Sequence, residues 1–274
     1  MALHPYSCGH CGHWQRWFAA PPACPVCTDV RNALPDNGWS WLTPADLTDR
    51  TARWAEVAPG VTGFWCEPQV GLGTTGWVLE TDDGLVGWEG AGFYPPAAIA
   101  ELRRRGGLAA LGASHVHGYG ALWQLQDELA PPTLAIDVED LSWTKAFVVT
   151  WPTDEHHELA PGLVMHRSGG HFPGHTVLHD ERRRILFVGD LLKVDLDGSV
   201  PVGLSCHKAF HAQIPLSHAE LRRARALVER LDFDAVATPF EFAAPVGTKQ
   251  VLALFDRQLS GRPTAGPIPL TELT

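Results

Sequence analysis

The sequence has no excess of basic residues and no long apolar run. Its 21 Lys and Arg residues are outnumbered by 31 Asp and Glu residues, which gives a net charge of −10, whereas binding to a nucleic-acid backbone depends on clustered Lys and Arg. No apolar run approaches the roughly 20 residues that a membrane helix needs, and the N-terminus lacks the basic-then-apolar pattern of a secretory signal. We therefore expect a cytoplasmic protein that binds neither nucleic acid nor membranes.

The remaining composition is typical of a soluble globular protein, with 45% hydrophobic and 19% charged residues. A chain of 274 residues can hold one large domain and a small appendage, because single cores seldom grow past about 250 to 300 residues. We find no internal repeat and no indication of oligomeric state. We predict a metal-binding knuckle at residues 1–35, a linker rich in Trp and Pro at 36–60, and one main domain at 61–274.

Four of the six cysteines lie in two CxxC pairs, Cys8 with Cys11 and Cys24 with Cys27, separated by twelve residues. Cytosolic thiols are kept reduced, so such pairs indicate metal binding before disulfides. This spacing lets two turns present four thiolates to one tetrahedral ion. The second pair encloses a proline and resembles a zinc-ribbon or rubredoxin knuckle.

The first 30 residues have almost no periodic apolar pattern, so a cross-link must hold them together. We therefore predict a structural Zn ion at the four cysteines, although Fe in the rubredoxin manner suits the same ligands. Since four thiolates fill the coordination sphere, we expect His10 and His13 to be exposed neighbours. Cys66 and Cys206 are expected to be buried and unpaired.

From Gly76 onward, strands alternate with helices. Asp83 and Gly84 predict a turn between strands at 77–80 and 85–88. A helix is expected at 96–105, and a second at 217–231, where Ser217 and Glu220 form a capping box. Further strands are expected at 108–114, 147–150, 163–166, 176–179, 185–188 and 235–238. Mixed hairpins and crossover helices imply sheets covered by helices.

Three separated segments carry histidine and aspartate residues that could share a metal ion. His115 and His117 follow a predicted strand, and side chains at positions i and i+2 of an extended segment point to the same side. His171 and His175 come in a later glycine-rich segment, and Asp190 follows a short apolar strand.

The order of these segments resembles the metallo-β-lactamase superfamily. The sequence HFPGHT from His171, a strand, a turn and then ILFVGDLL around Asp190 are similar to that family's motifs, and the match covers residues 70 to about 245. The resemblance implies an α/β fold, a metallo-β-lactamase-like αββα sandwich behind the small N-terminal knuckle. It implies that His115, His117 and His171 bind the first metal ion and that Asp190 lies where the family bridges to a second, with His175 outside the ligand set.

The sequence departs from the family's pattern at the second metal ion. Tyr119 and Gly120 stand where the HxHxDH motif has Asp and His, and the segment after the strand at 235–238 offers only Glu241 in place of the family's last His. Three ligands of the second ion are thus missing together. We expect one metal ion, or none.

Histidines and one carboxylate suit Zn²⁺, Fe²⁺ or Mn²⁺. A single Zn²⁺ with an open position brings the pKa of bound water down to about 7. We therefore predict a hydrolase of an unknown small molecule, with His171 and Asp190 as catalytic residues and Asp190 as general base where it does not bind the ion.

Two alternatives remain open. One is a mononuclear non-haem iron oxygenase similar to the persulfide dioxygenases of this fold, and the other is a non-catalytic binding protein with a vestigial site. Residues that could surround the ion are Tyr119, His175, His207, His211 and Glu241. For Tyr119 an ordinary hydrogen-bonding role is favoured over ligation of Fe³⁺, and for His207 and His211 solvent-facing or core positions are favoured.

Overall fold

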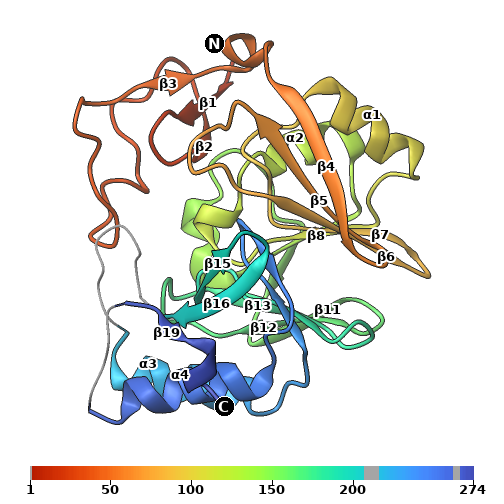
Figure 1. Cartoon of the computed structure of the whole chain (residues 1–274). Helices are drawn as coiled ribbons and strands as arrows, with labels where there is room; N and C mark the ends of the chain where they lie inside the picture. The colour runs from red at the N-terminus through yellow and green to blue at the C-terminus, as the bar shows by residue number, and fades with distance from the viewer. Residues whose placement is uncertain (1, 207–215, 262–265) are drawn as a thin grey trace. The chain divides into compact units, whose positions relative to one another are not determined.

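The computed structural model describes residues 2–206, 216–261 and 266–274. The chain forms two compact units, Met1–Thr153 and Asp154–Thr274 (Figure 1). Within the described ranges, no helix is both long enough and apolar enough to cross a membrane. The predicted neighbours of the metal ion at His207 and His211 lie outside the described residues.

The first unit begins with a small sheet of order β2-β1-β3. Its strands are β1 (His4–Cys8), β2 (Trp14–Trp17) and β3 (Trp41–Leu42). Trp14 fastens this sheet to the rest of the unit, because its indole Nε1 donates a hydrogen bond to the carbonyl of Gly92 at 2.9 Å. The ring of Trp14 also lies 5.2 Å from that of Trp123, measured between centroids. The buried indole thus packs the knuckle against the loop at Gly92 and the ring of Trp123.

The larger sheet of the first unit has the order β10-β9-β8-β7-β6-β5-β4. Its strands are β4 (Thr51–Ala58), β5 (Val61–Glu67), β6 (Gly76–Thr81), β7 (Gly84–Trp88), β8 (Ala110–Gly112), β9 (Thr133–Asp137) and β10 (Trp151–Thr153). Strands β4 to β7 are antiparallel, whereas β7 to β10 are parallel. Parallel neighbours need crossover connections, which contain α1 (Pro96–Arg104) and α2 (Leu122–Leu129). Edge strand β4 lies inside the stretch predicted as a linker.

The second unit has a six-stranded sheet of order β11-β12-β13-β14-β17-β18 and a three-stranded sheet of order β15-β16-β19. The strands are β11 (His156–Ala160), β12 (Leu163–Arg167), β13 (Thr176–Asp180), β14 (Ile185–Phe187), β15 (Lys193–Asp197), β16 (Val200–Ser205), β17 (Ala235–Ala237), β18 (Phe242–Ala243) and β19 (Ile268–Pro269). Helices α3 (His218–Val228) and α4 (Thr248–Leu259) lie side by side (Figure 1). The buried face of α3 shares one apolar core with β14 and α4.

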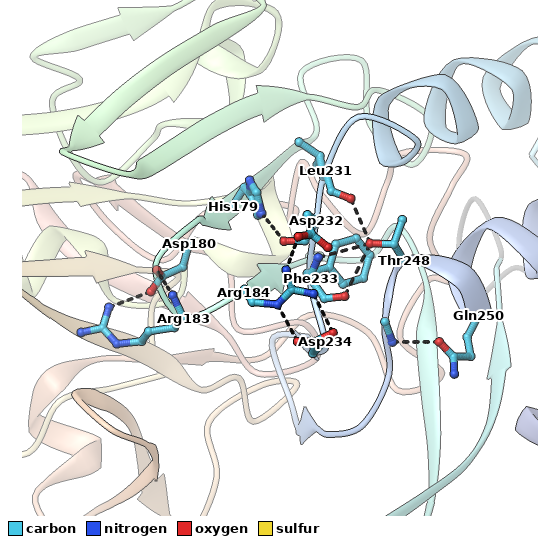
Figure 2. Close-up of polar contacts among 11 residues, drawn as sticks. His179, Asp180, Arg183, Arg184, Leu231, Asp232, Phe233, Asp234, Thr248 and Gln250 are labelled. Carbon is cyan, nitrogen blue, oxygen red and sulfur yellow. Dashed lines mark hydrogen bonds and ion pairs between the residues drawn. The ribbon is translucent and has the colours of Figure 1, made fainter.

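Polar contacts hold the loop that follows α3, at residues 231–234 (Figure 2). Arg184 forms ion pairs with Asp232 and Asp234, and His179 Nε2 donates to the carbonyl of Asp232 at 3.0 Å. From the other side, Thr248 Oγ1 donates to the carbonyl of Leu231 at 2.9 Å. The loop is thereby tied to the β13–β14 hairpin and to α4, and β17 pairs in parallel with β14.

Most predicted elements are confirmed. The hairpin at 77–88 is formed by β6 and β7, and the helix at 96–105 is α1. The capping box of α3 is present, since Ser217 Oγ accepts from the backbone N–H of Glu220 at 3.2 Å and the Glu220 carboxylate accepts from that of Ser217 at 2.7 Å. The domain boundaries at residues 35 and 60 stay predictions.

The predicted strand at 147–150 is wrong, because β10 begins only at Trp151. The amide side chain of Gln126 accepts a hydrogen bond from the backbone N–H of Val148 at 2.9 Å and donates to its carbonyl at 2.7 Å. A side chain from α2 thus takes the place of a neighbouring strand. The apolar and β-branched residues that suggested a strand here could not show this long-range contact.

His166 in β12 should make the protein sensitive to acid. Burial, reinforced by the nearby His179, His156 and Arg230, lowers the pKa of His166 to about 4. Because the unfolded chain binds a proton near pH 6.5, the stabilising contribution is complete above that pH and is lost as the pH falls toward 4. We expect His166→Gln to reduce the loss of unfolding free energy between pH 7 and 4 by about 1 kcal/mol, allowing for partial exposure. Urea unfolding at both pH values measures this, and an equal loss in both proteins would refute it.

Candidate metal centres

Four cysteine Sγ atoms converge in the N-terminal knuckle. Cys8 ends β1, and Cys11 lies in the turn before β2, while Cys24 and Cys27 lie in a second turn. All four Sγ atoms lie within 4.8 Å of one another, with 3.9 Å between Cys8 and Cys27 and 3.6 Å between Cys11 and Cys24. A tetrahedral ion with Zn–S bonds of about 2.3 Å separates its sulfur ligands by about 3.8 Å. The predicted cluster therefore has the dimensions of a zinc or iron site.

Backbone hydrogen bonds shape both turns of the knuckle. The N–H of Gly12 donates to the carbonyl of Cys8 at 2.8 Å, and the N–H of Thr28 donates to that of Cys24 at 3.1 Å. Contacts with the other three thiols lower the pKa of Cys8 and raise that of Cys11. A cation is bound by thiolates, so its binding to these four cysteines would release their protons.

His13 does not lie where the sequence suggested. His10 is exposed as expected, but His13 is only 4% exposed, and burial lowers its pKa to about 4. The residue directly precedes Trp14, whose indole is fixed against Gly92, and this docking carries His13 into the interior. The surface position predicted for His13 is therefore wrong.

In the first unit, His115 and His117 are both buried and their ring centroids lie 5.1 Å apart. His115 is extended, with φ −170° and ψ −178°, but His117 lies in the short 3₁₀ helix η2 (Val116–Gly118). A hydrogen bond of 2.9 Å from the N–H of Gly118 to the carbonyl of His115 closes this turn. A turn thus brings the two histidines together. The sequence analysis predicted that they lie on the same side, but it did so from the i, i+2 geometry of an extended segment, and that reason is wrong. Ser114 Oγ lies 2.8 Å from His115 Nδ1, which leaves ligation to Nε2.

In the second unit, His171 and Asp190 lie together. His171 Nε2 is 3.4 Å from Asp190 Oδ2, and both side chains are buried. Their loops contain Gly170 with φ +90° and Gly189 with φ +53°, a left-handed conformation that glycine adopts at least cost. The β12–β13 connection therefore carries an imidazole and the β14–β15 connection a carboxylate, and the two groups lie close together.

The described residues contain two groups of potential metal ligands. One is the cysteine cluster, and the other consists of four buried side chains, His115, His117, His171 and Asp190. Three imidazoles and a carboxylate fit a divalent cation, because a buried carboxylate needs a compensating charge. The donor set does not select between Zn²⁺ and Fe²⁺.

Tyr119 does not have the properties of a phenolate ligand. Its ring is buried and packs edge-on against Phe147, with 5.3 Å between centroids. In the described part of the chain, its hydroxyl has no hydrogen-bond partner. Burial, reinforced by the charges of Asp140, Glu89 and Asp137, raises the pKa of Tyr119 well above 10. The residue is a neutral phenol at physiological pH, which disfavours the Fe³⁺ role considered for it.

The backbone is closely packed at the positions where the family's motif has ligands of a second metal ion. Gly120 has φ +41°, and a Cβ atom there would lie 2.2 Å from the carbonyl oxygen of Gly90 and 2.4 Å from that of Ala91. A Cβ atom on Gly118 would lie 1.7 Å from Glu89 Oε2, which accepts a hydrogen bond from the N–H of Ser114 at 3.2 Å. A histidine at position 120 therefore has no space without movement of the backbone. The sequence showed the missing ligands but not this packing.

His175 and Glu241 both lie near Asp190. The buried His175 accepts a hydrogen bond at Nε2 from the backbone N–H of Asp190, at 3.0 Å. Burial raises the pKa of Glu241, with a further contribution from the charge of Asp190, while Thr238 acts in the opposite direction. Neither residue belongs to the group of four potential ligands.

Comparison with known proteins agrees with this architecture. Residues 97–231 match the model of the metallo-β-lactamase superfamily. The chain is 25% identical over 250 residues to the uncharacterized protein YmaE of Bacillus subtilis (strain 168), which covers 86% of this chain and 88% of that protein.

Two solved structures share the fold. The metallo-β-lactamase FIM-1 from Pseudomonas aeruginosa, in its mono-zinc form, has a TM-score of 0.57 at 14% identity and covers 78% of this chain and 98% of its own. The metallo-β-lactamase DIM-1, exposed to ceftazidime, has a TM-score of 0.55 at 13% identity and covers 75% of this chain and 96% of its own. The expected α/β metallo-β-lactamase fold with an N-terminal four-cysteine cluster is confirmed.

Proposed function

We propose that this chain, whose residues 97–231 match the model of the metallo-β-lactamase superfamily, is a metal-dependent hydrolase with a mononuclear centre. His115, His117, His171 and Asp190 would hold the ion, and Zn²⁺ is the ion we propose for it. A second, structural Zn²⁺ would be held by the four cysteines. The substrate would be a small molecule, since the net charge of −10 opposes binding to polyanions.

The observation that carries the proposal is the set of four buried ligands. Within each unit the ligand pair is already formed, with 5.1 Å between the rings of His115 and His117 and 3.4 Å between His171 Nε2 and Asp190 Oδ2. Burying an ionised carboxylate is costly unless it is paired or binds a cation. These side chains are thus suited to binding rather than to packing.

A single ion is supported by the backbone around Gly120. The clash that a Cβ atom at Gly120 would make with the carbonyl of Gly90 excludes the usual histidine, and Tyr119 stands where an aspartate would be needed. The mono-zinc form of FIM-1 is a precedent for one zinc ion in this fold. Together these points favour one ion at the histidine centre.

Zn²⁺ with an open position lowers the pKa of a coordinated water to about 7 and so supplies a nucleophile at neutral pH. Ser114 Oγ lies 2.8 Å from His115 Nδ1, and this contact would fix the orientation of the ring toward a bound ion. Where the three histidines alone hold the ion and leave it an open position, Asp190, whose Oδ2 lies 3.4 Å from His171 Nε2, would instead accept a proton from the attacking water.

Metal analysis of protein purified without added metal tests the proposal. We expect two zinc ions per chain in the wild type and one in His171→Ala, with loss of hydrolysis across a panel of chromogenic ester, lactam and phosphodiester substrates. The exposed His156 gives the control variant His156→Ala, which should keep both ions. Iron in place of the second zinc, with oxygen consumption on thiol substrates, would replace the hydrolase by the oxygenase alternative. A single ion that only Cys24→Ser removes would overturn the catalytic proposal.

A further inference from the structure

His175 is buried between the two loops that carry His171 and Asp190. It follows the first loop and begins the approach to β13, four residues after His171. Its Nε2 lies 3.0 Å from the backbone nitrogen of Asp190, and its Nδ1 lies 2.7 Å from Ser168 Oγ. Both ring nitrogens are therefore engaged within the second unit.

These two contacts determine the protonation of the ring. A backbone N–H can only donate, so Nε2 of His175 must accept and carries a lone pair. The neutral imidazole then has its proton on Nδ1 and donates it to Ser168 Oγ. The Ser168 hydroxyl in turn donates to the carbonyl of His175 at 3.1 Å. Each hydrogen bond in this series, from Asp190 through His175 to Ser168, has a defined direction. Nε2 of His175 is occupied by the N–H of Asp190.

The backbone of His175 holds the other loop. Its carbonyl accepts hydrogen bonds from the N–H groups of Ser168 and Gly169, both at 2.9 Å. Residues 168–170 precede His171 directly and include two glycines in the left-handed region, Gly169 at φ +61° and Gly170 at φ +90°. A loop with two glycines can adopt many conformations, and hydrogen bonds such as these select one of them. One residue thus fixes both loops that deliver ligands in the second unit.

We propose that His175 is a positioning residue for the metal centre. Through its ring it holds the backbone of Asp190, through its carbonyl it holds the loop of His171, and together these contacts set the spacing of 3.4 Å between His171 Nε2 and Asp190 Oδ2. His175 itself is not a ligand, because Nε2 is used by Asp190 and Nδ1 by Ser168. The inference rests on the proposed metal-binding function of His171 and Asp190.

Zinc affinity of two substitutions at position 175 tests this role. The oxygen of His175→Gln can accept from the Asp190 N–H, whereas His175→Phe fills the space without an acceptor. Chelator competition on the purified holoprotein measures each zinc ion, with the cysteine-bound ion as internal reference. We expect His175→Phe to weaken the histidine-bound ion about 10- to 100-fold, the range found for partners of metal ligands. His175→Gln should stay within about 5-fold of the wild type, below that range.

A matched control separates positioning from general destabilisation. His179 lies in β13, the strand that begins directly after His175. It is also buried, and its Nε2 donates to the carbonyl of Asp232 at 3.0 Å (Figure 2). His179→Phe should lower thermal stability as much as His175→Phe does, yet leave the affinity of the histidine-bound zinc unchanged. Wild-type affinity in His175→Phe, or equal weakening by Gln and Phe, would overturn the inference.

Nitrogen-15 NMR of the holoprotein gives a second measurement that does not depend on any variant folding. We expect His175 to be protonated at Nδ1 and unprotonated at Nε2. A proton on Nε2 would contradict the assignment even if zinc binding is normal. If the wild type holds only the cysteine-bound zinc, the proposed function fails and the positioning role fails with it. If it holds two ions and His175→Phe binds both as tightly, only the positioning role fails.

Discussion

Replacing Cys24 with serine is expected to remove one zinc ion per chain and to unfold the N-terminal knuckle. The knuckle contains only three short strands, of five, four and two residues, which is too little to bury a core of its own. Structural Zn²⁺ in small domains contributes about 10 to 16 kcal/mol of binding free energy at neutral pH, and this becomes folding free energy. We expect the knuckle to lose at least about 3 kcal/mol of this stabilisation.

Tryptophan fluorescence, to which Trp14 contributes, measures this change. The indole is 2% exposed and donates to the carbonyl of Gly92 at 2.9 Å, so release of the knuckle should expose it and shift the emission to longer wavelength. The buried Cys66 lies outside the cluster, and Cys66→Ser serves as the control that should keep both zinc ions. A Cys24→Ser protein that keeps its full zinc content and a buried Trp14 would show that the cysteine cluster does not hold a structural ion.

Local spacing in the sequence was sufficient to predict the cysteine cluster. The two CxxC pairs need only two turns, and each turn is closed by its own backbone hydrogen bonds, so the cluster follows from residues near one another in the chain. The capping box of Ser217 and Glu220 is likewise contained in four residues. In these places the determining contacts are local, and a single sequence is enough to identify them.

Contacts between distant segments could not be predicted in the same way. Gln126 completes the backbone hydrogen bonds of Val148, 22 residues away, and so prevents the strand expected at 147–150. His13 is carried inward because Trp14 docks on Gly92, 78 residues away. The histidine pair was found for a reason that is wrong, since η2 and not an extended strand brings His117 beside His115. The order of histidines was visible, but the turn that joins them was not.

The close approach of Gly90 and Gly120 leads to the last prediction. Restoring the family's usual residues with Tyr119→Asp and Gly120→His should not restore a second metal ion. A Cβ atom at position 120 meets two carbonyl oxygens, at 2.2 and 2.4 Å, and both belong to backbone that cannot rotate away as a side chain can. An aspartate at position 119 would add a further buried charge to Asp140, Glu89 and Asp137, which already act on Tyr119. Both changes are therefore destabilising before any ion can bind.

We expect Gly120→His alone to lower the free energy of unfolding by about 3 kcal/mol or more, from steric overlap and left-handed strain combined. Gly38 also has a positive φ, +74°, but a Cβ atom there meets nothing within 4 Å. Gly38→His should therefore cost only the strain, about 1 kcal/mol, and the difference between the two variants isolates the overlap. Denaturant unfolding measures stability, and zinc analysis in excess metal counts the ions. A stable double variant with a third zinc ion per chain would show that the second position was lost through residue identity alone, and that the backbone at Gly120 does not enforce a mononuclear centre.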